Sequence, residues 1–555
     1  MAGGIKKPVN VFRLKDLGEP KEIFNWRLWL AVISFGLMGA ARGVDEGLIG
    51  GAFNSKNFQN SINYQSYSVH EQTNIKANVS AMVQIGSVGG ALFAFVVCDR
   101  VGRLWATRQL CIVWIVGIAI FMGNGGNLGA VYAGRFIAGL GVGQTVVVAP
   151  VYLAEIAPAS IRGLCTCVFT GFVYLGIVLA YFANYGASVN IGEHTHARWE
   201  LPTSLHIMFA GIVFLLSFTQ YESPRYLVKI GKDEEAIINM SRVRNLPRDN
   251  PYVLQEINNI RLQLQEEQEA TLGQGWLGVV KEMFLVPSNL YRIYLGLMAQ
   301  ILSQWSGAGS ITLYAPSLFA LIGVTGTNEG LLVTAVFGIV KLAGAIICAL
   351  FLVDVIGRKR SLLIGIALQA ISMIYIAGFL TAVPQLGTVS TFKLAPSQTP
   401  VSKGAIFMIF LSGFGWALGW NSMQYLLTAE LFPLRIRAMS TSLVMCFHFA
   451  NQYGSSRALP NMLLSKHLGG IDPAGTFWFF AVITIAGFVW VFVTVPETAG
   501  RDLESMDRLF SLPWYKIGMY GNRHAEEVDL AMDEKMMAMN QQEGQAQQVE
   551  TVRNV

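Results

Sequence analysis

Charged residues and cysteines are scarce in this sequence, and each scarcity excludes a class of protein. Asp, Glu, Lys and Arg make up 14% of its 555 residues, whereas about 25% is usual in soluble domains. The six cysteines all lie within apolar stretches, so we expect no disulfide framework. Residues 1–22 are polar and contain no short apolar core, which gives no sign of a cleavable signal peptide. The net charge of +5 is small and does not indicate nucleic-acid binding.

Apolar residues, by contrast, are abundant. They make up 53% of the chain, more than a water-soluble core could hide, so we expect an all-α integral membrane protein. Stretches of about 20 apolar residues can cross a bilayer as helices. We predict twelve such spans, at residues 28–50, 79–98, 109–124, 129–152, 164–184, 201–219, 293–315, 330–353, 361–381, 404–427, 439–464 and 474–495.

The loops between these spans differ in charge. The loops after the second, fourth, eighth and tenth spans contain DRVGR, AEIAPASIRG, DVIGRKR and AELFPLRIRA, whereas 51–78 and 382–403 hold few basic residues. Short basic loops face the cytoplasm, so we expect both termini there. The resulting division is a cytoplasmic N-terminal segment (1–26), a six-helix bundle (27–219), a cytoplasmic helical linker (220–290), a second six-helix bundle (291–496) and a cytoplasmic tail (497–555).

The two halves of the chain repeat each other. CDRVGRL (98–104) recurs as VDVIGRK (353–359), AEIAPASIRG (154–163) recurs as AELFPLRIRA (429–438), and YESPRYL (221–227) has a counterpart in VPETAGRDL (495–503). Each pair lies at the same position relative to the predicted spans. Duplicated halves that meet around a midplane site are typical of secondary transporters.

These motifs, together with GRFIAGLGVG, PVYLAEIAPASIRG and PETAGRDLE, resemble the signature set of the sugar porter family of the major facilitator superfamily. The resemblance runs from about residue 25 to 505. Within the family the chain is most similar to fungal quinate and sugar permeases, on FHFANQYGSSRALPNML (447–463) and GIVKLAG (338–344).

This resemblance implies twelve transmembrane helices in two pseudo-symmetric six-helix bundles, which rock around a central site in alternating access. The expected protein is a multi-pass transporter of the plasma membrane and not an enzyme, with no cofactor and no metal. Its expected partners are a small-molecule substrate, a proton and the lipid bilayer, with no nucleic acid, and we expect a monomer.

The charged residues of the repeated motifs form a predicted cytoplasmic latch. Carboxylate–guanidinium pairs between the bundles would hold the inner side closed and would break when it opens. One exposed pair contributes at most about 1 kcal/mol, but a network can bias an equilibrium between two conformations. The alternative is that the basic loops only fix the topology. The predicted latch residues are Asp99, Arg100, Arg103, Glu155, Arg162, Glu222, Arg225, Asp354, Arg358, Lys359, Glu430, Arg435, Arg437, Glu497 and Arg501.

Asp45 lies in the first span, where an ionised side chain costs several kcal/mol. The resemblance implies that Asp45 is the proton-coupling carboxylate and that Arg135 is its partner, although Val44 replaces the aromatic residue that the family has before the carboxylate. A buried carboxylate can exchange protons if its cationic partner comes and goes. The alternative is a permanent Asp45–Arg135 pair that only orients two helices.

Arg42, three residues before Asp45, shares a helix face with it, and the two could neutralise each other. The guanidinium could instead bind a substrate carboxylate through two parallel hydrogen bonds. Lys341 and His448 are further polar residues inside spans, and for His448 a structural role competes with ligand binding. The role of Glu46 stays open.

The amides that bind sugar in the family are partly replaced. The resemblance places Thr170, Ser303 and Gly309 at three amide positions, while Gln304 and Asn451 are kept. A hexose needs several amides, because each hydroxyl stripped of water must be bonded again. The predicted substrate-binding residues are Arg42, Thr170, Ser303, Gln304, Gly309, Lys341, Trp420, Phe447, His448 and Asn451.

The sequence therefore predicts a proton symporter that imports a small polyhydroxylated acid, such as quinate or a hexuronate. A neutral monosaccharide symporter or facilitator is the alternative within the same class. A non-transporting nutrient sensor is the alternative from another class.

Overall fold

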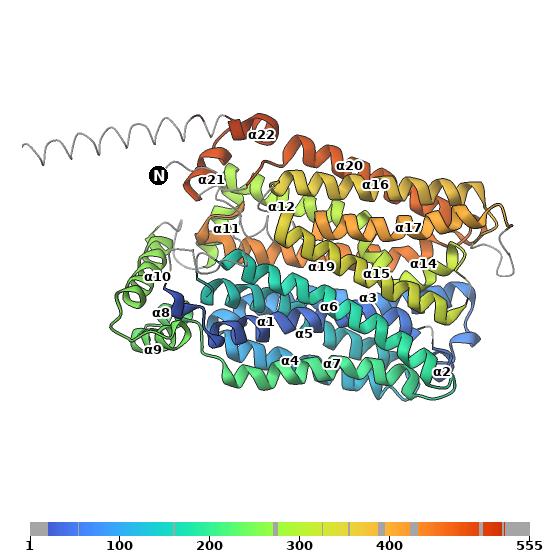
Figure 1. Cartoon of the computed structure of the whole chain (residues 1–555), viewed down its shortest axis with the longest axis horizontal. Helices are drawn as coiled ribbons and strands as arrows, with labels where there is room; N and C mark the ends of the chain where they lie inside the picture. Colours follow the sequence, from blue (N-terminus) through green and yellow to red (C-terminus); the bar gives the residue numbers. More distant parts are fainter. Residues whose placement is uncertain are drawn as a thin grey trace, which may run out of the picture.

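The computed structural model describes residues 20–53, 55–158, 161–269, 276–324, 326–352, 356–386, 395–421, 431–498, 503–523 and 527. Every regular element in these ranges is a helix. The long helices run side by side, and those of the first half of the chain form one group beneath those of the second half (Figure 1). Within these ranges, ten helices are long and apolar enough to cross a membrane.

Six long helices build the first half. Ser68 begins the second of them with a capping box, in which its side chain and that of Glu71 each accept a hydrogen bond from the other residue's backbone N–H. Gly102, at φ 91°, makes the tight turn into the next helix. The six are α1 (Trp26–Phe53), α3 (Val69–Val101), α4 (Arg103–Met122), α5 (Leu128–Ile156), α6 (Arg162–Asn190) and α7 (Ala197–Leu216), with the short α2 (Lys56–Ser61) after α1.

The second half repeats this arrangement with one broken helix. The seventh predicted span is divided into α12 (Pro287–Trp305), α13 (Ala308–Leu313) and α14 (Ala315–Leu321), with Gly307 at φ 88° in the first break. The others are α15 (Thr327–Ile347), α16 (Arg358–Ala382), α17 (Thr399–Trp416), α19 (Leu434–Met462) and α20 (Asp472–Thr494). Of the twelve predicted spans, only the broken seventh span and the polar α19 are not among the ten helices that are long and apolar enough to cross a membrane.

Many short helices gather at the end of the bundle where α1 begins, which we call the terminal end; the opposite end is the far end (Figure 1). The linker helices α8 (Pro224–Lys229), α9 (Asp233–Arg244) and α10 (Pro251–Glu269) share a small apolar core. α11 (Trp276–Leu285) precedes α12, and α21 (Leu503–Phe510) and α22 (Trp514–Lys516) follow α20.

Buried arginines attach these short helices to the two halves. Arg244 of α9 donates to the carbonyl oxygen of Ile156 at the end of α5 at 2.8 Å, and it also pairs with Glu256. In the second half, Arg292 of α12 binds Asp507 of α21 at 2.6 Å. The linker is therefore fixed to the first half and α21 to the second.

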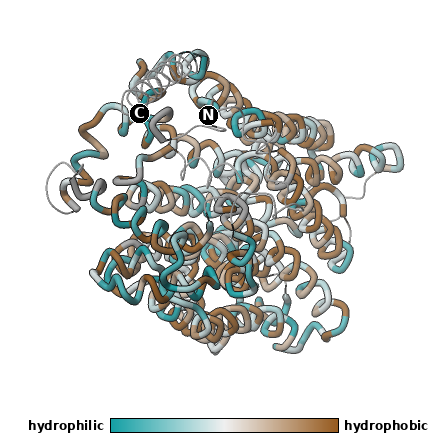
Figure 2. The backbone as a smooth tube through the Cα atoms, turned by 60° about the vertical axis from the view of Figure 1, so that its left-hand side comes forward, coloured by the Kyte–Doolittle hydropathy of each residue, from teal (hydrophilic) through white to brown (hydrophobic). Residues whose placement is uncertain are grey.

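The outside of the bundle is apolar, as expected for helices whose solvent is lipid. Leu215 on α7 and Val482 on α20 are 68% and 61% exposed. Figure 2 shows hydrophobic colouring along the long helices and hydrophilic colouring concentrated in the connections.

Glycines allow α1 and α6 to pack closely. Gly39, Gly43 and Gly47 are spaced four residues apart on α1, and a Cβ at any of them would meet α6 at less than 3 Å. On α6, a Cβ at Gly176 would overlap the carbonyl oxygen of Ala40. Small residues at this spacing let helix backbones approach in a membrane, where van der Waals packing drives association.

Replacing Gly176 by Ala is expected to destabilise the protein, because the added methyl group forces α1 and α6 apart. Overpacking of this kind typically costs about 1–3 kcal/mol. Thermal unfolding of the purified full-length chain measures the loss as a lower Tm. Gly171→Ala on the same helix is the matched control, since nothing lies within 4 Å of its added Cβ. Equal losses in both variants would contradict the packing argument.

Candidate functional site

A buried ion pair joins α1 and α5 inside the first half. Asp45 and Arg135 are each 1% exposed, and Nη1 of Arg135 donates to Oδ1 of Asp45 at 2.7 Å. Nε of Arg135 donates to the carbonyl oxygen of Val79 on α3 at 3.2 Å. The structure thus brings together the two residues that the sequence analysis paired, and their role in proton coupling stays a prediction.

His206 of α7 is a third member of this cluster, which the sequence analysis missed. Its ring is 2% exposed, and Nε2 lies 3.3 Å from Oδ1 of Asp45. Nδ1 lies 3.0 Å from the carbonyl oxygen of Thr203. A lone histidine in the apolar sixth predicted span was the sequence feature that could have indicated this role. The sequence does not show, however, that the face of α7 with His206 packs against α1.

Polar side chains from the two halves meet where α1 passes α19. Nη2 of Arg42 lies 3.3 Å from Oε1 of Glu46 and 3.3 Å from Nε2 of His448. Nε2 of Gln452 donates to the same oxygen of Glu46 at 3.4 Å. Arg42 and Glu46 belong to the first half, whereas His448 and Gln452 belong to the second. We call these four residues the central cluster, and it bridges the halves.

His448 is bonded at both ring nitrogens. A guanidinium can only donate, so the nitrogen that faces Arg42 is an acceptor and Nδ1 carries the proton. Nδ1 therefore donates to Oε1 of Gln300 at 2.9 Å, whereas Nε2 of Gln304, also on α12, only lies near the same nitrogen at 3.2 Å. His448 is therefore a neutral bridge between Arg42 and α12, which fits the structural role considered for it.

Lys341 lies on α15 and is 2% exposed. Its Nζ donates to Oγ1 of Thr312 at 2.6 Å and lies 5.3 Å from the ring centre of Tyr174 and 5.5 Å from that of Phe337. The partners of this ammonium group are thus a hydroxyl and two aromatic rings. A buried cation with neutral partners gains from an anion placed beside it.

The other predicted substrate residues differ in what they offer. Asn451 accepts a hydrogen bond from the indole of Trp305 at 3.1 Å, and the hydroxyl of Ser303 donates to a carbonyl of its own helix at 3.1 Å. Both groups are therefore engaged within the second half. Trp420, which is 1% exposed, lies in the π-helix Ala417–Asn421 that continues α17. Thr170, Gly309 and Phe447 lie on α6, α13 and α19.

Hydrogen bonds join the halves at the far end. Nζ of Lys76 on α3 donates to Oγ of Ser317 on α14 at 2.9 Å, and Arg457 of α19 donates to Asn74 of α3 at 2.9 Å. Gly50 of α1 approaches α13 so closely that a Cβ would lie 2.7 Å from its backbone. The halves are thus in contact at the far end as well as at the central cluster.

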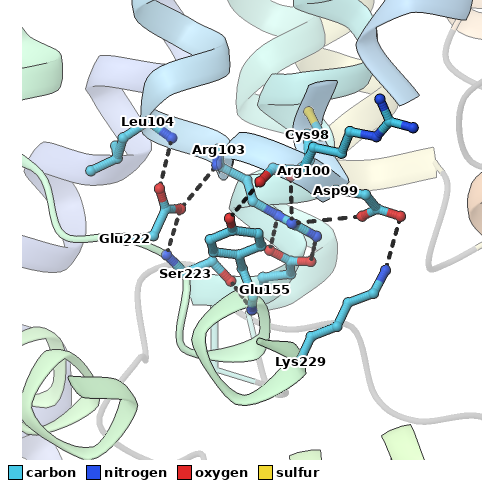
Figure 3. A network of polar contacts seen from close by, with 10 residues as sticks. Cys98, Asp99, Arg100, Arg103, Leu104, Glu155, Glu222, Ser223 and Lys229 are labelled. Atoms are coloured by element: carbon cyan, nitrogen blue, oxygen red, sulfur yellow. Dashed lines mark hydrogen bonds and ion pairs between the residues drawn. The ribbon is translucent and has the colours of Figure 1, made fainter. Parts of the chain in front are cut away.

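Arg103 organises a polar network at the terminal end (Figure 3). Its Nε and Nη2 donate to the two carboxylate oxygens of Glu155 at 2.9 and 2.7 Å. Its Nη1 donates to the carbonyl oxygen of Cys98 at 3.0 Å. This bidentate pair closes α4 against the end of α5.

A carboxylate anchors the same turn in each half. Glu222 accepts from the first two backbone N–H groups of α4 at 3.0 and 3.1 Å, directly after Gly102. Glu497 accepts from the first two N–H groups of α16 at 2.8 and 3.1 Å, directly after Gly357. Because helix N-termini favour anions, each carboxylate stabilises the helix that it caps. The sequence duplication is therefore a duplication of geometry.

The described pairs of the predicted latch join elements of the same half. Arg103 binds Glu155 within the first half, and Lys229 of α8 binds Asp99 of α3 at 2.9 Å. These pairs therefore differ from the expected pairs between the bundles, because the tight turn at Gly102 directs Arg103 toward α5 of its own half. Asp354, Glu430 and Arg501 lie outside the described residues, as do the side chains of Arg162 and Arg435.

Arg103→Gln is expected to lower the stability by about 3–5 kcal/mol, because removing one partner leaves the other charge of a buried pair without compensation. Arg103 and Glu155 are only 7% and 9% exposed. The measurement is the Tm of the purified full-length protein. Arg100→Gln changes the exposed arginine of the same motif and serves as the control; a comparable loss there would show that charge at this turn, and not the pair, is responsible.

Comparisons with known proteins agree with this fold. The profile of the sugar (and other) transporter family matches residues 30–510. The chain is 31% identical over 502 residues to the quinate permease of Emericella nidulans, which covers 90% of this chain and 91% of the relative. It is 31% identical over 499 residues to the probable quinate permease of Aspergillus niger, with 90% of each covered.

Solved structures of a xylose transporter resemble this chain. The proton:xylose symporter XylE bound to 6-bromo-6-deoxy-D-glucose superposes with a TM-score of 0.71 at 23% identity, over 87% of this chain and 99% of that one. The partially occluded inward open conformation of XylE from E. coli gives a TM-score of 0.69 at 21% identity, over 86% and 100%. The likeness confirms the predicted major facilitator fold.

Proposed function

The chain belongs to the sugar (and other) transporter family, and from that premise we propose that it is a proton symporter that imports a small polyhydroxylated carboxylate, such as quinate or a sugar acid. Members of this family are membrane transporters and not enzymes. The observation that carries the proposal is the buried Asp45–Arg135 pair between α1 and α5, because α1 also supplies Arg42 and Glu46 of the central cluster.

Proton binding to Asp45 is the step that would couple the gradient to transport. The carboxylate and the guanidinium attract each other while both are charged, so the ionised pair holds α1 and α5 together. A proton on Asp45 removes one charge and weakens this attraction. α1 could then move relative to α5, and loss of the proton to the other side would restore the pair.

Two buried cations support the choice of an anionic substrate. Arg42 and Lys341 lie on opposite sides of the contact between the halves, on α1 and α15, and only Arg42 has an acidic side chain as an ion-pair partner among the described residues. A substrate carboxylate could bind Arg42 in place of Glu46 and would add an anion near Lys341. The two relatives named quinate permeases support the same substrate class.

The contacts between the halves support one direction of opening. We propose that the termini and the linker are cytoplasmic, so that the far end faces outward and is closed in this structure by the contacts of Lys76 and Arg457. Opening toward the outside would break these contacts together with the Arg42–His448 bridge. The terminal-end networks would keep each half rigid, and they would contact the opposite half when that end closes. We propose a monomer of the plasma membrane.

Asp45→Asn is expected to abolish accumulation of substrate against its gradient, because an amide neither binds nor releases the coupling proton. Exchange of labelled for unlabelled substrate is expected to continue. Uptake into proteoliposomes under an inward proton gradient, with and without a protonophore, measures both. Asp45→Glu, which keeps a titrating carboxyl, is the control. Accumulation by the Asn variant with unchanged dependence on pH would contradict proton coupling through Asp45.

Arg42→Gln and Lys341→Gln are each expected to raise the KM for quinate or a hexuronate about tenfold, because a charge-assisted hydrogen bond contributes about 1.5–3 kcal/mol. The KM for glucose or xylose should change less than the KM for the acids. Lys466→Gln, at an exposed lysine of the far end, is the control for loss of a positive charge. Preferred uptake of neutral sugar, unaffected by Arg42→Gln, would support the monosaccharide alternative instead.

A further inference from the structure

The imidazole beside Asp45 has no part in the proton step described so far. We propose that His206 shares the transported proton with Asp45, so that the coupling site is a carboxylate–imidazole pair that holds one proton between its facing atoms. The proposal rests on the proposed symport, because it assigns the carrier of the same proton.

The hydrogen bond of the ring to its own helix fixes which nitrogen can titrate. Nδ1 lies 3.0 Å from the carbonyl oxygen of Thr203, and a carbonyl oxygen can only accept, so Nδ1 carries a hydrogen. Nε2, which lies 3.3 Å from Oδ1 of Asp45, is therefore a bare lone pair whenever the ring is neutral. The position between His206 and Asp45 is the one place in this pair where a second hydrogen can be added.

A single proton between Oδ1 of Asp45 and Nε2 of His206 gives both atoms a hydrogen bond. Without that proton, the two atoms are acceptors that face each other. With the proton on Oδ1, a neutral carboxyl group donates to Nε2; with the proton on Nε2, an imidazolium donates to the carboxylate. When the proton leaves, the O–H or N–H bond breaks and two acceptors face each other in a site where both side chains are at most 2% exposed. Two buried acceptors without a hydrogen between them are unfavourable, so the ring must then move away.

The surroundings of His206 make Asp45 the group that controls whether Nε2 of the ring is protonated. The charged group that contacts the imidazole is Asp45 of α1. Arg135 of α5 binds the same oxygen, Oδ1, of Asp45. α4 contributes the ring of Trp114, which meets the imidazole edge to face. Among the described residues, α6 places no acidic or basic side chain in ion-pair contact with His206.

Because Arg135 and His206 contact the same oxygen of Asp45, protonation of that oxygen would change the helix to which Asp45 is bonded. Arg135 and His206 both approach Oδ1, at 2.7 and 3.3 Å. The ionised carboxylate favours the guanidinium of α5, whereas the protonated carboxyl favours the imidazole of α7. The proton would thus release Asp45 from α5 and attach it to α7. Protonation would then loosen the contact of α1 with α5 and strengthen its contact with α7.

His206→Gln tests this in proteoliposomes containing the full-length chain. Glutamine can keep a polar contact but has no basic nitrogen, so the proton should be held less tightly. We expect transport to persist while the alkaline limb of uptake against external pH moves about one unit toward lower pH. His196→Gln, which removes an exposed histidine just before α7, is the matched control and should leave the profile in place. An unshifted profile for His206→Gln overturns the proposal.

A second measurement needs no substrate and so separates this proposal from the proposed function. Infrared titration of the purified protein in detergent follows the carbonyl band of a protonated carboxyl, which Asp45→Asn identifies by its loss. The proposal expects the titration of that band to move to lower pH in His206→Gln. An identical titration in both proteins refutes the shared proton, whereas a shifted titration without coupled uptake of any tested acid or sugar refutes the symport and retains the pair.

Discussion

The structure depends on the rule that a charge inside a membrane must be paired or neutralised by a proton. Asp45 obeys this rule with Arg135 and His206 around a single oxygen. The three side chains come from α1, α5 and α7, so under the proposed coupling a change in the proton content of the site would change which helices are attached to one another. The close glycine packing of α1 against α6 would then transmit such a change through the first half.

The duplication of the chain is easiest to understand through the two anchored turns. Glu222 and Glu497 each bind the start of a helix that follows a glycine with positive φ. A glycine is needed there because the left-handed backbone is unfavourable for other residues. Each half therefore has its own rigid corner at the terminal end, and the halves meet along α3 and α19 and along α6 and α15.

Much of this arrangement could be predicted from the sequence, and the failures share one cause. Apolar stretches predicted twelve spans, including the one that becomes α19, which is more polar than the other spans because several of its polar side chains face the other half. Motif positions predicted the pairing of Asp45 with Arg135. The sequence did not reveal that His206 joins them, or that Arg103 binds Glu155 inside its own half, because both depend on which helix faces are turned toward each other. Helix periodicity shows which residues share a face of a helix, but only the tertiary packing determines which other helix that face contacts.

The attachment of the linker to the first half has a consequence for regulation. Arg244 fastens α9 to the end of α5, and Asn25 and Arg27, at the start of α1, donate to carbonyl groups of α9. A protein that bound only α8 and α9 would move with the first half. It would have equal affinity for both conformations and would leave their populations unchanged. A protein that bound α9 and α21 together would bridge the two halves and could favour one conformation.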